Sequence, residues 1–192
     1  ITIGRIVVAP PWDAGSDPLS TIVVQPSTGF GTGHHATTRL TLKALQELTL
    51  DDRIVLDIGC GSGVLAIAAV KLGARSAVGI DIDPDALENA RDNASLNDTG
   101  DRVRFEEGDF REIRRDAGVV IANLTGALLE RSAEALAAMV APGGYLIVSG
   151  FMDSEQAAVV PAIEKFLAIQ KIAQEEEWMC AVFVSWQEVA GS

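Results

Sequence analysis

Asp57-Ile58-Gly59-Cys60-Gly61-Ser62-Gly63 places three glycines between an apolar run and a helical pattern. The run Ile54–Ile58 predicts a short buried strand, and Val64–Leu72 carries apolar residues at helical spacing. A glycine-rich turn from a strand into a helix lets the backbone approach a ligand closely, beside the free N–H groups at the helix start. Tight turns also need glycine for structural reasons alone, so the turn by itself leaves both interpretations open.

The order of the glycines narrows the kind of ligand. A nicotinamide dinucleotide site would have its third glycine at position 64, where this chain has Val64. A phosphate-binding P-loop would need Gly-Lys-Ser or Gly-Lys-Thr, and the sequence contains neither. The order D-x-G-x-G-x-G instead favours a loop that wraps an amino-acid and ribose moiety rather than a pyrophosphate.

Strands and helices alternate outward from this turn. The expected strands are Ile54–Ile58, Ala77–Ile82, Val103–Glu107, Gly118–Ala122, Tyr145–Ser149, Ile169–Ala173 and Met179–Trp186. The expected helices are about Arg39 to Leu48, Val64–Leu72, Pro84 to about Leu96, Gly126–Val140, and one capped by Asp153 or Ser154 and interrupted or kinked at Pro161. Runs that are apolar on both faces and alternate with helices predict a mostly parallel sheet covered by helices. The last two strands, joined by Gln174–Glu177, predict an antiparallel hairpin. We therefore expect an α/β fold with a seven-stranded, mostly parallel sheet.

Polar side chains follow successive strands of this predicted sheet. Asp81 lies 24 positions after Asp57, where a carboxylate takes both ribose hydroxyls of a bound nucleoside. Asp83 is better explained as the N-cap of the helix that opens with proline. Asp109 follows the third strand and can accept the exocyclic amine of an adenine, or it is an ordinary exposed turn residue. Asn123 ends the fourth strand. Because the carboxyl ends of parallel strands share one edge of a sheet, we expect these groups to converge on one crevice.

Composition and cysteine content exclude several classes of protein. The chain has 192 residues, 48% of them apolar and 22% charged, as in an ordinary globular domain, and it is long enough for one domain or one plus a small appendage. It contains no apolar run long enough to span a bilayer and no signal-peptide pattern. Cys60 and Cys180 have no third cysteine beside them, which argues against a zinc site or a disulfide framework. We expect a cytoplasmic, reduced protein.

The net charge is strongly negative. It is −12 at pH 7, and residues 116–192 carry three basic and ten acidic side chains. Because the sequence has no basic block, the counterion-release term behind most nucleic-acid binding is missing, and we expect no direct contact with nucleic acid. The acidic last third either keeps the protein apart from its neighbours or faces a cationic partner.

A longer pattern upstream of the glycine turn points to one family. Phe30-Gly31-Thr32-Gly33-His34-His35-Ala36-Thr37-Thr38 resembles the FGTGxHxTT motif of the ribosomal protein L11 methyltransferase family. The resemblance continues through the block from Asp57 to Ala74 without a gap and through Gly79–Pro84. Ala122-Asn123-Leu124, then Pro142-Gly143-Gly144 and Ser149-Gly150, complete the order, so that the resemblance covers about Trp12 to the C-terminus.

The resemblance implies a Rossmann-like class I methyltransferase fold that uses S-adenosylmethionine. Carried over position by position, it implies cofactor contacts at Thr38, Gly59, Asp81 and Asn123, with Gly61 and Asp109 beside them. It divides the chain into a linker and N-terminal strand segment, 1–28, and a methyltransferase domain, 29–192. The implied activity is methylation of the α-amino group and lysine ε-amines of a basic ribosomal protein, with no membrane partner.

The sequence also departs from the family pattern. Family members usually carry an N-terminal substrate-recognition domain of about a hundred residues, and this chain begins at or just before the linker that follows it. Gln25 stands where an acidic residue is common, Ser27 where glycine is usual and Gly29 where alanine is frequent. Two alternatives therefore remain. One is a standalone methyltransferase that acts on another protein or a small amine, and the other is a non-catalytic nucleoside-binding module.

Asn123 is the residue that we expect to act in catalysis. Methyl transfer to an amine is a one-step displacement that needs positioning more than acid–base groups. The Asn123 amide oxygen can accept one N–H of the target amine, and the backbone carbonyl of Ala122 or Leu124 can accept another. The strand end reads Asn-Leu-Thr-Gly rather than Asn-Pro-Pro-Tyr, which disfavours nucleobase or glutamine methylation and fits a flexible aliphatic amine.

The remaining polar candidates have simpler explanations. His34 and His35 have no third ligand, so no metal site is expected. We expect His35 to fix the loop over the cofactor, and Thr37-Thr38 either borders the site or simply caps the next helix. Cys60 is interpreted as a small packing residue rather than a nucleophile.

Overall fold

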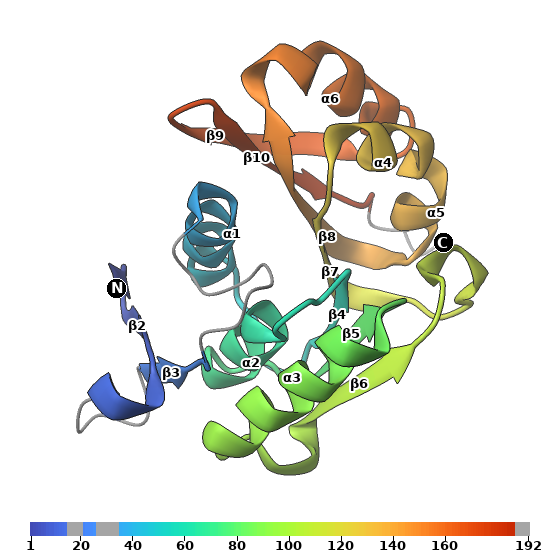
Figure 1. Cartoon of the computed structure of the whole chain (residues 1–192). Coiled ribbons are helices and arrows are strands. Elements are labelled where there is room, and N and C mark those ends of the chain that lie inside the picture. The colour runs from blue at the N-terminus through green and yellow to red at the C-terminus, as the bar shows by residue number, and fades with distance from the viewer. Residues whose placement is uncertain (15–20, 26–34, 187–192) are drawn as a thin grey trace.

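The computed structural model describes residues 1–14, 21–25 and 35–186, and its centre is a seven-stranded sheet (Figure 1). The strands are β4 (Ile54–Ile58), β5 (Ser76–Asp81), β6 (Val103–Glu107), β7 (Ala117–Asn123), β8 (Val140–Met152), β9 (Ala168–Glu175) and β10 (Trp178–Val184). They lie in the order β6-β5-β4-β7-β8-β10-β9. The first five are parallel, and β10 pairs antiparallel with both β8 and β9. The predicted fold class and the predicted C-terminal hairpin are confirmed.

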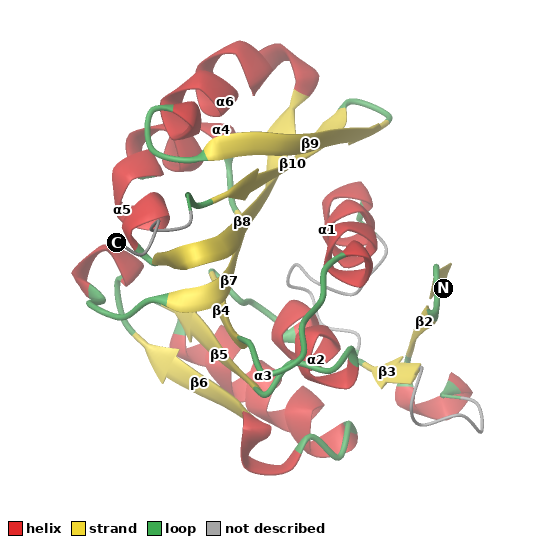
Figure 2. Ribbon diagram, turned by 180° about the vertical axis from the view of Figure 1, so that it is seen from behind, coloured by secondary structure: helices red, strands yellow, loops and turns green. Residues whose placement is uncertain are grey.

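Helices cover both faces of the sheet. The α-helices are α1 (Ala36–Glu47), α2 (Val64–Lys71), α3 (Pro84–Leu96), α4 (Gly126–Arg131), α5 (Ala133–Ala138) and α6 (Gln156–Glu164). The 3₁₀ turns are η1 (Pro11–Asp13), η2 (Gly100–Arg102), η3 (Phe110–Glu112) and η4 (Asp153–Glu155). Helices α1, α2 and α3 lie on one face, and α4, α5 and α6 lie on the other, as the two opposed views show (Figures 1 and 2). None of the helices in the described residues has the length and apolar character needed to cross a membrane.

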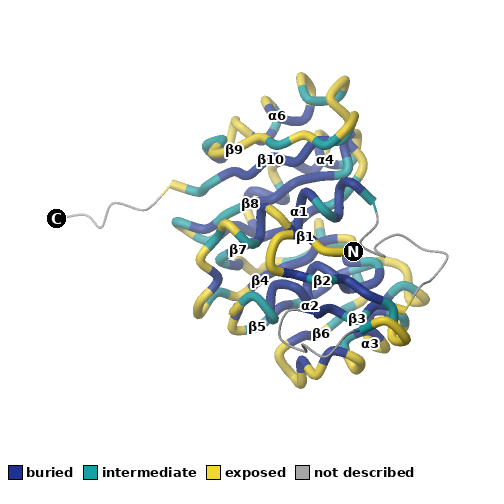
Figure 3. The backbone as a smooth tube through the Cα atoms, turned by 90° about the vertical axis from the view of Figure 1, so that its left-hand side faces the viewer, coloured by how far each residue is buried: buried dark blue, intermediate teal, exposed yellow. Residues whose placement is uncertain are grey.

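Two layers of core flank the central strands. In β4, Val55 packs with α1 and α2 on one side, whereas Leu56 and Ile58 pack with α4, α5 and α6 on the other. Both sides of the strand are therefore buried, which explains its continuous apolar run. Figure 3 shows β4, β7 and β8 as a dark blue, buried centre.

A small second sheet joins the first layer. It has the order β1-β2-β3, formed by β1 (Thr2–Ile3), β2 (Ile6–Ala9) and β3 (Thr21–Val23). Its apolar residues Ile3, Ile6 and Ile22 belong to the same buried cluster as α1 and α2. The expected division between residues 28 and 29 falls within 26–34, outside the described residues.

The predicted helix Gly126–Val140 is wrong in two respects. The chain leaves helical geometry at Ser132, where φ is −108° and ψ is 10°, so that two short helices replace one. Val140 already begins β8, which pairs with Ala117. Tertiary pairing of Val140 thus overrides the helical spacing of the sequence.

Strand β8 is longer than the predicted Tyr145–Ser149. Val140 pairs with Ala117 and Tyr145 pairs with Val119, so the residues between Val140 and Tyr145 bulge away from β7. Pro142 lacks a donor for the ladder, and Gly143 has a φ of +69°, which suits a bulge. Pro142 and Gly143, which precede the predicted strand Tyr145–Ser149, therefore lie inside β8.

The start of α6 also differs from the prediction. Neither Asp153 nor Ser154 caps the helix, because η4 intervenes, and the Asp153 side chain accepts from the backbone N–H of Ser154 at 2.6 Å. The helix continues through Pro161 to Glu164, so it is not interrupted at the proline.

Candidate functional site

The glycine turn joins β4 to α2 at the carboxyl edge of the sheet. Gly59, Gly61 and Gly63 have φ values of +67°, +50° and +75°, which L side chains rarely adopt. Space is a second constraint, because a Cβ on Gly59 would lie 2.6 Å from the Leu124 side chain and one on Gly63 would lie 2.7 Å from the Phe105 ring. These contacts explain why the turn needs glycine before any ligand is considered.

Asp81 ends the neighbouring strand β5 and holds the turn. Its Oδ2 accepts from the backbone N–H of Gly61 at 2.9 Å, and its Oδ1 accepts from the N–H of Asp83 at 3.1 Å. A carboxylate offers about four acceptor positions, so half of them remain for a ligand. Asp83 caps α3 by accepting from the N–H of Asp85 at 3.0 Å, as predicted.

Asp57 lies beneath the turn and is fully buried. Its Oδ2 accepts from the backbone N–H of Ala66 at 3.1 Å, whereas its Oδ1 has no hydrogen-bond partner among the described residues. The pKa of this carboxyl is raised to about 7, chiefly by burial, with the bond from Ala66 opposing the shift and the negative charge of Asp81 adding to it. Asp57 is the one acidic residue in the apolar run Ile54–Ile58, and this position in a predicted buried strand is the feature of the sequence that could have indicated a buried carboxyl.

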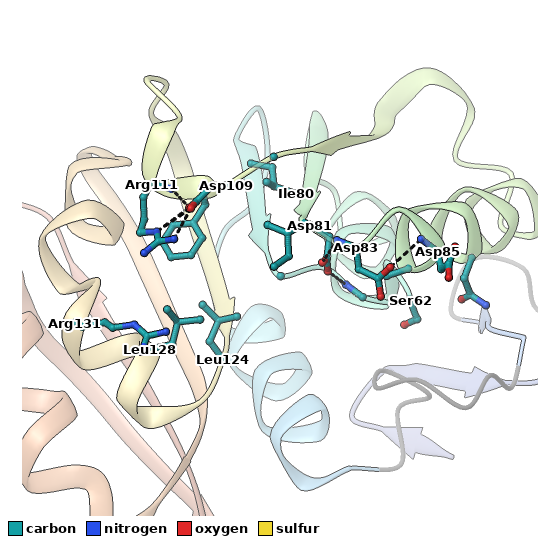
Figure 4. A pocket seen from close by; sticks show the side chains of 17 residues that line it. Ser62, Ile80, Asp81, Asp83, Asp85, Asp109, Arg111, Leu124, Leu128 and Arg131 are labelled. Carbon is teal, nitrogen blue, oxygen red and sulfur yellow. Dashed lines mark hydrogen bonds and ion pairs between the residues drawn. The ribbon is translucent and has the colours of Figure 1, made fainter.

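A cavity of about 760 Å³ opens beside these residues, within the range of small-molecule sites (Figure 4). It is lined by Gly59, Gly61, Ser62, Ile80, Asp81, Ile82, Asp83, Asp85, Ala86, Asn89, Gly108, Asp109, Phe110, Arg111, Leu124, Leu128 and Arg131. Four predicted contact residues therefore share one cavity: Gly59, Gly61, Asp81 and Asp109. Three strands, β4, β5 and β6, deliver them to the same edge, as expected for a parallel sheet.

Asp109 is already engaged by the side chain of Arg111. Its Oδ1 accepts from the backbone N–H and the Nε of Arg111, each at 2.9 Å, and its Oδ2 accepts from Nη2. These hydrogen bonds lower the pKa of Asp109 to about 2, so the carboxylate is charged at neutral pH. The sequence analysis missed Arg111, because the pairing depends on the conformation of η3.

Thr38 lies in the first turn of α1 and is buried. The alternative that Thr37-Thr38 caps this helix is wrong, since the N-cap is His35, whose side chain accepts from the Thr37 N–H. The His35 ring also stands edge-on to Trp178 with centroids 4.7 Å apart. His34 lies outside the described residues.

Asn123 ends β7 next to the cavity. In the part of the chain that the structure describes, neither Asn123 nor Thr38 lines the cavity, although Leu124 does. Gly150 of β8 has a φ of +89°, and a Cβ there would clash with the Leu124 carbonyl oxygen and lie 2.9 Å from the Asn123 Oδ1. Two acceptor oxygens, one from the amide and one from the backbone, therefore lie close together at this strand end.

Apolar side chains complete the lining and were not singled out from the sequence. Ile82 follows Asp81 directly and is 73% exposed, and Phe110, Leu124 and Leu128 also line the cavity. Figure 4 shows Leu124 and Leu128 on the side opposite Asp81. The lining therefore combines carboxylates with apolar side chains. Cys60 is buried, which raises the pKa of its thiol and confirms it as a packing residue.

The charges of the lining select against a phosphate ligand. Four carboxylates line the cavity, those of Asp81, Asp83, Asp85 and Asp109, against two guanidinium groups. One of these, that of Arg111, is paired with Asp109. Carboxylates accept hydrogen bonds from hydroxyls and amines and attract cations, so the cavity fits a ligand that offers such groups.

Comparisons with known proteins agree with this chemistry. A family model described as "Ribosomal protein L11 methyltransferase (PrmA)" matches residues 1–185. Among curated relatives, the ribosomal protein L11 methyltransferases of Hamiltonella defensa and Haemophilus influenzae (strain PittEE) are 41% and 40% identical over 175 residues. Each alignment covers 91% of this chain but only 57% and 59% of the relative, so the chain spans less than two thirds of their length.

Solved structures share the fold. A ribosomal protein L11 methylase from Lactobacillus delbrueckii subsp. bulgaricus superposes with a TM-score of 0.86 at 23% identity and covers 97% of both chains. An RNA methyltransferase from Salinibacter ruber, in complex with S-adenosyl-L-homocysteine, gives a TM-score of 0.62 at 24% identity and covers 80% of this chain and 95% of that one. The class I methyltransferase fold predicted from the sequence is confirmed.

Proposed function

The chain belongs to the ribosomal protein L11 methyltransferase family, and from this premise we propose that it is an S-adenosylmethionine-dependent protein N-methyltransferase acting on ribosomal protein L11. The observation that carries the proposal is the Asp81 carboxylate, held by the Gly61 N–H on the rim of a 760 Å³ cavity. That arrangement leaves carboxylate acceptors facing a space of the right size for a nucleoside.

The residues present fit this cofactor. S-adenosylmethionine, when bound, supplies a methyl group activated by the positive charge on sulfur. The acidic lining suits a cationic, hydroxyl-bearing ligand.

Each cofactor-binding residue has a proposed role. Asp81 accepts the two ribose hydroxyls, and Asp109, whose two oxygens also accept hydrogen bonds from Arg111, is the proposed acceptor of the adenine amino group. Gly59 and Gly61 let the backbone approach the amino-acid part, which their missing Cβ atoms permit. Thr38, buried at the start of α1, is proposed to border the same site.

Asn123 is the proposed catalytic residue. Its amide oxygen accepts an N–H of the target amine while the nearby backbone carbonyl of Leu124 accepts a second, which orients the nitrogen lone pair. The proximity of these two oxygens at Gly150 supports this role. A lysine or α-amino group must be neutral to attack, so its proton leaves to solvent before the N–CH₃ bond forms. The S–CH₃ bond would break in the same displacement, with S-adenosylhomocysteine as the leaving group.

The proposed partner is a basic protein in the cytoplasm. The net charge of −12 favours a cationic partner and disfavours nucleic acid. The names of the curated relatives, ribosomal protein L11 methyltransferases, support a ribosomal protein as this partner. The cytoplasmic location is proposed together with this partner. L11 recognition is proposed for the whole protein.

Transfer of labelled methyl groups tests the activity. Wild type incubated with methyl-labelled S-adenosylmethionine and purified ribosomal protein L11 is expected to label L11. Asn123→Ala is expected to lower kcat at least a hundredfold and to weaken cofactor affinity by a smaller factor, because Asn123 is also an expected cofactor contact. Label on a small amine but not on L11 would favour the standalone alternative. A folded wild type that labels neither acceptor would contradict the proposed activity.

A further inference from the structure

Three asparagines recur at intervals of four along α3: Asn89, Asn93 and Asn97. This spacing places them on one face of the helix. Asn93 is completely buried, and Asn97 is 5% exposed. A buried amide is costly unless it is hydrogen-bonded, so the partners of these two side chains show what the face contacts.

Asn93 joins the glycine turn to the N-terminal segment. Its Nδ2 donates to the carbonyl oxygen of Ser62 and to the Oδ1 of Asn89, and its Oδ1 accepts from the backbone N–H of Gln25, all at 2.9 Å. Ser62 and Asn89 line the cavity, whereas Asn93 itself stands behind them. One side chain thus bonds to the cavity wall in two places and to the chain that precedes the Phe30–Thr38 motif.

Asn97 makes the same kind of bonds without contact to the cavity. Its Oδ1 accepts from the N–H of Val23 at 2.8 Å, and its Nδ2 donates to the carbonyl oxygens of Val23 and Asn93, each at 2.6 Å. It therefore fixes β3 to α3 as a neighbouring strand would. Asn97 is a matched control for Asn93, because it is a buried amide on the same helix face bound to the same N-terminal segment.

The glycine turn needs such external support. Its three glycines have wide conformational freedom, and the turn is held at Gly61 by Asp81 and, one turn into α2, at Ala66 by Asp57. Asn93 holds it at Ser62 by a hydrogen bond to the backbone carbonyl oxygen. Asn93→Ala removes the hydrogen bond that joins the Ser62 carbonyl oxygen to α3.

We propose that Asn93 is a positioning residue that fixes the glycine turn at Ser62 relative to Gln25 and, through the turn, sets the affinity for the cofactor. The effect on affinity rests on the proposed function. The effect on the turn does not, because it follows from the hydrogen bonds of the protein alone.

Two matched variants, Asn93→Ala and Asn97→Ala, test the proposal. Both are expected to lower the thermal unfolding midpoint. Only Asn93→Ala is expected to speed amide hydrogen exchange at Gly61 and Gly63, at least tenfold by NMR without ligand, while Asn97→Ala changes it less than twofold. The same difference is expected in titrations with S-adenosylhomocysteine, with at least tenfold weaker binding for Asn93→Ala and less than twofold change for Asn97→Ala.

The outcomes separate this inference from the proposed function. A folded wild type that does not bind S-adenosylhomocysteine would contradict the proposed function, and the exchange rates would still test Asn93. Equal changes in exchange and affinity for the two variants would overturn the inference and leave Asn93 a structural residue. If Asn93→Ala does not fold, the pair Asn93→Ser and Asn97→Ser replaces the alanine variants under the same criteria.

Discussion

At the scale of single residues, the buried carboxyl of Asp57 makes the stability of the folded protein depend on pH. The pKa of this group is 3.8 in an unfolded chain and about 7 in the folded protein, chiefly because of burial. Between these values the folded state binds more protons than the unfolded state, so this group makes the protein less stable as pH rises from about 4 to about 7. Above pH 7 both states are ionised and the effect levels off.

Replacing Asp57 by asparagine removes this dependence. We expect the unfolding free energy of Asp57→Asn, relative to wild type, to increase by about 2 kcal/mol between pH 5.5 and pH 8, since the wild type loses stability over that interval. Urea unfolding of both proteins at the two pH values measures the change. A difference that is the same at both pH values would show that Asp57 is not protonated in the folded state near pH 5.5.

Some residues of the candidate site could be predicted from the sequence, whereas the pairings between them could not. The position of Asp81 could be predicted, because it depends only on where a strand ends. The bond from Asn93 to Ser62 and the pair Asp109–Arg111 could not, because one joins residues 31 positions apart and the other requires the η3 turn. All the predicted cofactor contacts remain proposals, and Asn123 and Thr38 differ from the others because neither lines the cavity in the described part of the chain.

At the scale of elements, the junction of β4 and α2 is fixed by crowding as well as by backbone conformation. Gly63 has a φ of +75°, and a Cβ there would lie 2.7 Å from the Phe105 ring and 3.1 Å from Ala90. Gly100 has a similar φ of +57°, but a Cβ there would meet nothing within 4 Å among the described residues. Substitutions at these two glycines therefore distinguish the energetic cost of backbone strain, which both share, from the cost of close packing, which only Gly63 has.

Gly63→Ala is therefore expected to destabilise the protein more than Gly100→Ala. The strain of a left-handed alanine costs about 1–2 kcal/mol at either position, and overpacking adds about 1–3 kcal/mol at Gly63 alone. Chemical denaturation of the two variants measures both losses. Equal losses would mean that Phe105 moves aside without cost, and the close packing of the turn would not be a constraint.

Elements whose signals are local were predictable, whereas those set by pairing were not. Helix α3 begins with its Asp83 cap and Pro84 as the sequence indicates. The break of α4 from α5 at Ser132 and the start of β8 at Val140 follow from the pairing of Val140 with Ala117, 23 positions away. Helical spacing in the sequence carries no information about that partner.

At the scale of the whole molecule, the site lies where the sheet changes direction. From β4 the chain proceeds to β5 and β6 on one side, and it then returns to place β7 and β8 on the other. Loops from neighbouring strands diverge at such a switch point and leave a crevice outside the carboxyl ends. The glycine turn, Asp81 and Asp109 line the cavity there, and Leu124 closes it from β7.

The most direct test of this site is calorimetric titration of S-adenosylmethionine into wild type, Asp81→Ala and the control Asp101→Ala, which replaces an exposed carboxylate in η2 away from the cavity lining. We predict saturable binding by wild type and by Asp101→Ala, and binding weakened at least tenfold in Asp81→Ala, a loss of about 1.4 kcal/mol or more. A folded wild type that does not bind, or an Asp81→Ala variant that binds as tightly as wild type, would contradict the assignment of this cavity to the cofactor.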